Sequence, residues 1–373
     1  MTKVIHFHFD TKQNKGDAAV VYSIRDLILK HLSVKKYTHK GINELNIYPN
    51  IVRKAFKKYP FLINKLSSKI FEKIKELLDK DLVREINQHD IMIIGGGGLY
   101  SKGNFPLNEK LIDAIHIPIV LLSVGLNRNE GQSPFTLQEI NSIIKLNKKS
   151  SLSSVRDLNT LSFLKDFGFK KISVIADPAI FLESSKKKDL KFSKKLSIGI
   201  NIAQHNWQYQ EKFTDKIVSS YINALNKIKE DHDFQLFYLQ HDYREKEVIK
   251  NLKSHFKDMH VCNYNPYNLK YVYEKLDLVI CMMMHSSIFA FSSGVPFINI
   301  SYDIKNKAFA EMIKSSSSLI PVKNVSPEKI YNLAIDLINR RKSNDFPYLK
   351  KKYKDQTLKY IKRIKYLTNY NAH

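Results

Sequence analysis

The chain repeats one local pattern, a short apolar segment followed by an amphipathic one, and this pattern limits its fold more than any other feature. The expected strands are residues 4–9, 90–94, 117–125, 151–156, 172–175, 196–202, 234–240, 276–284 and 296–301. Between them lie segments with apolar residues at helical spacing, such as 18–32 and 157–167. Short apolar strands that alternate with helices are typical of parallel sheets covered on both faces. The sequence therefore predicts an α/β fold.

The pattern is interrupted by a charged segment with few apolar residues, 183–195. We interpret this segment as a linker between two doubly wound, Rossmann-like domains, residues 1–185 and 196–340, which a basic helical segment at 341–373 follows. Ligands of such sheets bind at the carboxyl ends of the strands. We therefore expect the binding site in a cleft between the two domains.

Composition narrows the classes of partner. The net charge of +25, from 61 Lys and Arg against 36 Asp and Glu, indicates an anionic partner. The sequence has no basic motif interleaved with aromatic residues, so we expect no nucleic acid partner. The histidines and the two cysteines lack the spacing of a zinc site, and we expect no metal. The sequence shows neither a signal peptide nor the ~20 apolar residues of a membrane span, which predicts a cytoplasmic protein.

Four of the chain's 12 glycines are consecutive, at Gly95, Gly96, Gly97 and Gly98. They directly follow the apolar strand 90–94, so we expect a loop whose backbone N–H groups point at an anion near the start of the next helix. A tight turn without a ligand is the alternative. The spacing fits neither a dinucleotide fingerprint nor a P-loop.

Asn14, Gly16 and Asp17 form a second candidate after the first strand. Asp17 either caps the helix that follows or contacts a substrate. Asn14 and the N–H groups of the loop are further candidates for substrate contacts.

His285 is the sharpest candidate, because the strand that ends at Met284 delivers it to the expected cleft. Ser286 or Ser287 is placed to cap the following helix, which we expect to stop at Gly294. Imidazole and backbone donors at a helix N-terminus can hold an anion together.

Other polar residues also follow strands. The guanidinium of Arg156 suits a carboxylate or phosphate, or else it pairs with a neighbouring acid such as Asp157. Asp177 either contacts a sugar hydroxyl or shapes the crossing to the second domain. Tyr302 and Lys305 supply a phenol and an ammonium group to the same cleft.

Two further pairs are weaker candidates. His205 and Trp207 fit either a platform for an acceptor sugar or a buried loop. We expect His6 and His8 to be partly buried residues of the first strand.

Several of these motifs occur in an order that resembles the polysaccharide pyruvyl transferase family. They are Asn14-x-Gly16-Asp17, the strand with Gly95–Gly98, Ser154-Val-Arg156-Asp157, Ala176-Asp177-Pro178-Ala179, His285-Ser286, Gly294-Val-Pro296 and Tyr302-Asp-x-Lys305. The resemblance covers about residues 14–310. It implies a fold like the two-domain GT-B glycosyltransferases, with phosphoenolpyruvate as the donor substrate, no other cofactor, and a hydroxyl of a cell-surface glycan or lipid-linked precursor as the acceptor.

The resemblance also implies a reaction. Arg156 and helix-end amides hold the anionic donor, and His285 protonates its methylene carbon so that a sugar hydroxyl adds to the neighbouring carbon. A histidine that titrates near neutral pH suits this proton transfer.

One position departs from the family pattern, because Met283 stands where the family usually has an arginine two residues before the histidine. Loss of a guanidinium beside a doubly anionic donor weakens binding by about 2–5 kcal/mol. Either Lys305 compensates, or the donor has changed. The alternative function is a GT-B glycosyltransferase that uses a nucleotide sugar.

Basic residues gather in two stretches that contain none of the candidate site residues, 53–80 and 340–365. They are either solvated helix faces or a surface that rests on an anionic membrane near a lipid-linked acceptor.

Overall fold

A computed structural model describes residues 1–8, 14–41, 80–101, 109–127, 133–203, 211–340 and 345–370. The first half forms a six-stranded parallel sheet in the order β2-β1-β3-β4-β5-β6. Its elements are β1 (Thr2–His8), α1 (Lys15–His31), β2 (Val34–Gly41), β3 (Ile91–Ser101), α5 (Glu109–Ala114), β4 (Ile119–Asn127), α6 (Leu137–Lys149), β5 (Leu152–Val155), α7 (Leu158–Asp166), β6 (Ser173–Val174) and the short 3-10 helix η2 (Pro178–Phe181).

The second half forms another six-stranded parallel sheet, in the order β12-β11-β10-β7-β8-β9. Its elements are β7 (Leu196–Asn201), α8 (Glu211–Asp231), β8 (Phe234–Leu239), η3 (Tyr243–Glu245), α9 (Lys246–His255), β9 (His260–Cys262), α10 (Pro266–Tyr273), β10 (Leu278–Cys281), α11 (Met284–Ser293), β11 (Phe297–Ser301), α12 (Ile304–Met312), η4 (Ser316–Ser318), β12 (Leu319–Pro321), η5 (Val322–Asn324), α13 (Pro327–Asn339) and α14 (Phe346–Tyr370). The predicted pair of doubly wound parallel sheets is confirmed.

In each sheet, the strand order shows one point at which successive strands begin to be added on the opposite side. The N-terminal sheet switches between β1 and β3, and the C-terminal sheet switches between β7 and β10. Counted from β7, the C-terminal order is the 3-2-1-4-5-6 arrangement of dinucleotide-binding folds. Ligands of doubly wound sheets bind at such switch points, which here lie beside the starts of α1 and α11.

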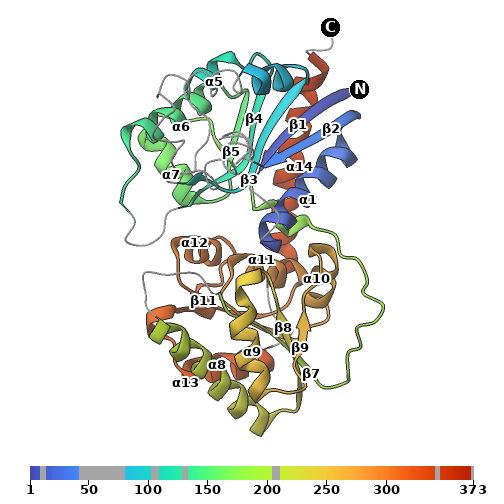
Figure 1. Ribbon diagram of the computed structural model, residues 1–373, viewed down its shortest axis with the longest axis vertical. Coiled ribbons are helices and arrows are strands. Elements are labelled where there is room, and N and C mark those ends of the chain that lie inside the picture. Colours follow the sequence, from blue (N-terminus) through green and yellow to red (C-terminus); the bar gives the residue numbers. More distant parts are fainter. Residues whose placement is uncertain are drawn as a thin grey trace, which may run out of the picture.

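The two halves lie one above the other, and α11 and α12 of the lower half face the upper half (Figure 1). Residues 183–195 connect them without a helix or strand. One apolar cluster is continuous across the junction, because it includes Ile24 of α1, Ile180 of η2 and Phe289 of α11. The junction is therefore packed like a core.

The C-terminal helix α14 ties the halves together (Figure 1). Near its start, Phe346 packs against Phe291 of α11. Further along the helix, the Tyr360 hydroxyl donates a hydrogen bond of 2.8 Å to the carbonyl of Leu121 in β4. Its buried residues recur at helical spacing, and most of its lysines lie on the exposed face.

Candidate functional site

The starts of α1 and α11 meet at the junction of the two halves. Gly16 packs so closely on His285 that a Cβ atom on Gly16 would lie 2.1 Å from the imidazole Nδ1. The backbone N–H of Lys15 also donates to the carbonyl of His241, at 2.9 Å, across the same junction. Two segments that are about 270 residues apart in the sequence thus form one site.

His285 is buried, with 7% of its surface exposed, in the first turn of α11. No side chain caps this helix, and the imidazole Nε2 has no hydrogen-bond partner. Burial, together with the positive charges of Arg156 and Lys305, lowers the pKa of His285 to about 3. The free protein therefore holds a neutral imidazole, and the expected titration near neutral pH is wrong for this state.

Arg156 follows β5 and is also buried. Its Nη1 lies 3.4 Å from Asp177 Oδ2 and its Nε lies 3.5 Å from Asp157 Oδ2, but Nη2 has no partner. The predicted ion pair with a neighbouring acid is thus present, although it occupies only part of the guanidinium. A Cβ atom on Gly125 would lie 2.2 Å from Nε, so Gly125 makes the space for this side chain.

Asp177 lies between these two residues. Its Oδ1 accepts a hydrogen bond from the N–H of Ala179, and its Oδ2 faces both Arg156 and, at 3.9 Å, His285 Nε2. Burial raises the pKa of this carboxyl, and the guanidinium of Arg156 opposes that rise. Asp177 therefore pairs with the guanidinium, lies beside the imidazole and starts η2 at the crossing between the halves.

Lys305 and Asp17 complete the polar cluster. The Lys305 ammonium lies 3.3 Å from Asp303, which caps α12, and close enough to influence both Asp17 and His285 electrostatically. Burial raises the pKa of Asp17 to about 6, although Lys305 and Arg156 oppose the rise. The Tyr302 hydroxyl instead turns to the sulfur of Met283, at 3.9 Å.

Both predicted helix caps differ from the structure. Asn14, not Asp17, caps α1, because its Oδ1 accepts from the N–H groups of Gly16 and Asp17. Ser286 and Ser287 lie inside α11, whose N-cap is Met283. Their hydroxyls bond to Tyr273, at 2.5 Å, and to the thiol of Cys281, at 3.2 Å, so they face the protein interior.

The predicted glycine loop is wrong as well, because Gly95–Gly98 lie inside β3, which continues to Ser101. A Cβ atom on Gly96 would lie 1.9 Å from Val20 of α1, and one on Gly98 would lie 2.6 Å from the Cβ of Asn127. Gly96 and Gly97 also have positive φ angles of 79° and 82°. The glycines therefore allow α1 and β4 to approach β3 closely.

Met283 is buried in the apolar core of the C-terminal half, and its N–H donates to Asn201 Oδ1 at 3.1 Å. The side chain at the position of the family's arginine thus faces the core. Lys305 and Arg156 are the cations that influence His285 in its place.

The remaining predicted residues have plain outcomes. His6 and His8 are buried in β1, as predicted, and His6 contacts the Tyr37 hydroxyl and the carbonyl of Gly95. His205 and Trp207 lie outside the described residues. In the ranges that the structure describes, no group of three or more His, Cys, Asp or Glu could hold a metal ion.

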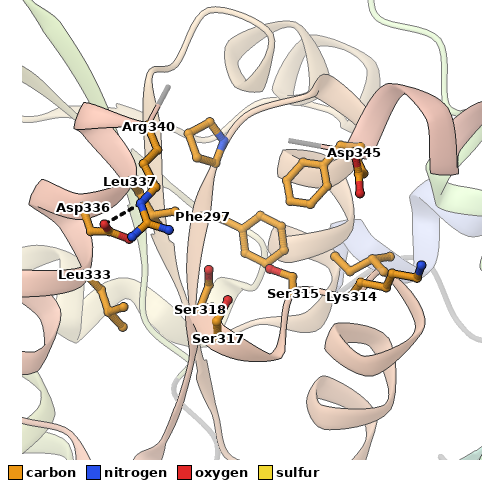
Figure 2. Close-up of a pocket in the computed structure, with 13 residues that line it drawn as sticks. Phe297, Lys314, Ser315, Ser317, Ser318, Leu333, Asp336, Leu337, Arg340 and Asp345 are labelled. Atoms are coloured by element: carbon orange, nitrogen blue, oxygen red, sulfur yellow. Dashed lines mark ion pairs between the residues drawn. The ribbon is translucent and has the colours of Figure 1, made fainter. Parts of the chain in front are cut away.

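A small cavity of about 20 Å³ marks the site itself, lined by Arg156, Asp157, Asp177, Met284 and Lys305 among others. A larger cavity of about 640 Å³ lies elsewhere (Figure 2). It is bordered by Phe297, where β11 begins, by Ser315, Ser317 and Ser318 before β12, and by the Asp336–Arg340 ion pair of 2.7 Å. Because these are the amino ends of the strands, this cavity is separate from the site at the carboxyl ends.

The two facing Rossmann-like halves, with a buried polar site at their junction, define a protein of the GT-B fold class. Solved structures agree. UDP-GlcNAc 2-epimerase from Neisseria meningitidis bound to UDP-GlcNAc has a TM-score of 0.58 at 14% identity, covering 96% of this chain and 100% of that one. Os79 from O. sativa in complex with U2F and trichothecene has a TM-score of 0.60 at 8% identity, covering 98% and 100%.

The sequence comparison identifies the family. The sequence model of the polysaccharide pyruvyl transferase family matches residues 14–304, and the chain belongs to this family. No curated protein sequence matches the chain. The family match extends from the Asn14 cap of α1 to the start of α12, and so contains each of the polar residues of the site except Lys305.

Proposed function

We propose that this protein transfers a pyruvyl group from phosphoenolpyruvate to a sugar hydroxyl of a cell-surface polysaccharide or of its lipid-linked precursor. One observation carries the proposal. In a chain of this family, the buried site contains two nitrogens without partners, Arg156 Nη2 and His285 Nε2. The buried guanidinium nitrogen is a donor without an acceptor, which is costly, and an anionic ligand would satisfy it.

The donor carries a phosphate and a carboxylate. Arg156 can hold one of these groups through Nη2, and the ammonium of Lys305, which is 3.3 Å from Asp303, can neutralise the other. The N-terminus of α11, which no side chain caps, adds backbone donors and a favourable dipole. In this proposal, these groups supply the positive charge that the family's arginine would supply at position 283.

In the reaction, a proton adds to the methylene carbon of the donor, and the neighbouring carbon becomes electrophilic. The sugar hydroxyl forms a bond to that carbon and loses its proton, and phosphate leaves with the electrons of its C–O bond. A second hydroxyl of the same sugar can then close a cyclic ketal. His285 is the proposed acid, and the negative charge of the donor would raise its pKa from about 3 because it offsets the nearby cations.

The test combines binding and transfer. Phosphoenolpyruvate is expected to raise the Tm, and the purified enzyme is expected to release phosphate only when an acceptor glycan is present. His285→Ala should abolish release while leaving the Tm of the free protein within a few degrees, whereas the exposed His255→Ala should change neither. Retained transfer by His285→Ala would remove this residue from the mechanism.

A nucleotide-sugar transfer reaction is the second candidate, and the buried Met283 in place of arginine is the observation that favours it. The M. jannaschii UDP-GlcNAc 2-epimerase in complex with UDP-GlcNAc and UDP has a TM-score of 0.54 at 13% identity, covering 98% of this chain and 99% of that one. Stabilisation by nucleotide sugars but not by phosphoenolpyruvate would select this candidate.

The outer face of α14 supports a second part of the proposal, a peripheral association with anionic lipid. The exposed face of α14 carries one acidic residue, Asp355, and seven basic ones. The basic residues are Lys351, Lys352, Lys354, Lys359, Lys362, Arg363 and Lys365. Each lysine or arginine near an anionic bilayer contributes about 1 kcal/mol. Within the described part of the chain, no helix is long and apolar enough to cross a membrane. The basic stretch 53–79 lies outside the described residues.

A further inference from the structure

A third cavity lies beside the small cavity of about 20 Å³ that Arg156 and Asp177 line. Its volume is about 480 Å³, within the range of ~300–1,000 Å³ that is typical of small-molecule sites. Leu126, Phe135 and Phe163 line it from the N-terminal half, and α12 of the C-terminal half lines it with Ile304, Ala308 and Glu311. These three residues of α12 share one helix face because they are spaced by four and three positions.

This cavity adjoins the reaction site, because two residues line both cavities. Asp157 and Lys305 line both the 480 Å³ cavity and the small cavity that contains Arg156 and Asp177. A molecule in the larger cavity would therefore lie beside the polar cluster of the reaction site. The sequence motifs that pointed to the reaction site do not include Phe163, Ala308 or Glu311.

The lining combines apolar faces with carboxylates. The rings of Phe135 and Phe163 are 5.7 Å apart, and the partly exposed Ile304 faces them across the cavity. Asp157 Oδ1 accepts hydrogen bonds from the N–H and hydroxyl of Thr160, while its Oδ2 is 3.5 Å from Arg156 Nε and retains accepting capacity. At the rim, Glu311 lies 3.8 Å from Lys307.

We propose that this cavity is the acceptor subsite and binds one pyranose residue whose neighbouring hydroxyls donate to Asp157 and Glu311. This inference rests on the proposed function, because it assigns the second substrate of the same reaction. A pyranose has the two surfaces that the cavity requires, apolar C–H faces and a rim of hydroxyl donors. The charges of the cavity balance, with Lys305 and Lys307 against Asp157 and Glu311, which fits an uncharged sugar better than a phosphorylated one.

The experiment measures sugar binding separately from donor binding. Methyl glycosides of glucose, galactose, mannose and N-acetylglucosamine are titrated into the full-length enzyme, and binding is followed by saturation-transfer NMR. Ala308→Trp fills the cavity from α12 and is expected to abolish saturation transfer. Leu158→Trp is the matched control, because Leu158 is 66% exposed on neighbouring α7 and does not line the cavity.

Glu311→Gln tests the hydroxyl contact without changing the volume, and we expect affinity to fall about tenfold through loss of a charged hydrogen bond. The rise in Tm with phosphoenolpyruvate should be unchanged in both cavity variants and lost in Arg156→Ala. Saturation transfer that persists in Ala308→Trp would overturn the subsite. So would the lack of saturation transfer from every glycoside to the wild-type enzyme, up to the solubility of each glycoside. Cavity-dependent sugar binding without any effect of phosphoenolpyruvate would instead refute the proposed donor while supporting the sugar subsite.

Discussion

A methyl group added at Gly16 tests whether α1 holds His285 in place. The Cβ atom of Gly16→Ala would lie 2.1 Å from Nδ1 and 2.3 Å from Cγ of His285, whereas ordinary contacts begin at 3.4 Å. The ring or the helix must therefore retreat by more than 1 Å. A displacement of this size at a reacting group reduces the rate by about 100-fold.

The same substitution should have little effect on stability. Overpacking costs about 1–3 kcal/mol, and replacement of glycine by alanine inside a helix returns up to about 1 kcal/mol. A net loss of about 0–2 kcal/mol corresponds to a decrease in Tm of a few degrees.

Gly168→Ala is the matched control. Gly168 ends α7 with a φ of 84°, and nothing lies within 4 Å of an added Cβ atom. The left-handed backbone costs alanine about 1–2 kcal/mol, a loss similar to that of Gly16→Ala. Phosphate release from phosphoenolpyruvate with acceptor and the Tm are measured for both variants. Equal activity of Gly16→Ala and wild type would show that His285 does not depend on its contact with α1.

Three further predictions concern charge. Calorimetric titration of phosphoenolpyruvate in buffers of different ionisation enthalpy should show uptake of about one proton. The reason is that His285 has a pKa of about 3 in the free protein and the charge of the donor raises this pKa. Proton uptake that persists in His285→Gln would assign the proton to another group. Burial raises the pKa of Glu245 to about 8, so the folded protein binds this proton more tightly than the unfolded chain, and stability should fall as pH rises from about 4.5 to 8. In urea unfolding, Glu245→Gln should reduce this fall, most clearly above pH 6 because the raised pKa of Asp17 adds to it at lower pH, and exposed Glu247→Gln should leave it unchanged. Charge reversal at Lys359 and Lys362 should weaken binding to anionic vesicles in flotation, by about 1 kcal/mol for each lost cation. Equal binding of the wild-type protein to neutral vesicles would contradict an electrostatic attraction between α14 and anionic lipid.

Local rules predicted the parts of the fold that depend on neighbouring residues. The helix predicted to stop before Gly168 is α7, and the glycine adopts the left-handed conformation that ends helices. Gly294 ends α11 in the same way, with a φ of 73°. In both cases the relevant interaction lies within one turn of helix, so the sequence contains the whole physical cause.

Three of the four edge strands, β2, β9 and β12, were not predicted, whereas β6 was. β2 has the sequence Val-Lys-Lys-Tyr-Thr-His-Lys-Gly and is only partly buried, so no apolar run marks it. Lysine on an edge strand prevents pairing with another chain, which explains a composition that local propensity does not favour. The short β9 and β12 also lie at the edges of their sheet.

The cap of α1 was predicted wrongly for a different reason, since two residues competed for the role. Asn14 and Asp17 both have side chains that cap helices. The bridge between Asn14 and Asp242 of the other half fixes the backbone before Lys15, and therefore decides the competition in favour of Asn14. A contact across about 230 residues determined a feature that looks local.

The glycines show most clearly which feature of the site could be predicted from the sequence. Glycine-rich backbone was interpreted as close approach to a ligand, and close approach is what the structure has, but the partners are side chains. A Cβ atom on Gly16 would clash with His285, and one on Gly125 would clash with Arg156 Nε, whereas one on Gly98 would make an ordinary contact of 3.4 Å with Arg156 Nη2. A chain with few glycines thus places two of them against the histidine and the arginine whose nitrogens lack partners. Because a Cβ atom at Gly16 or Gly125 would displace a polar group of the site, these glycines position the site even where they touch no substrate.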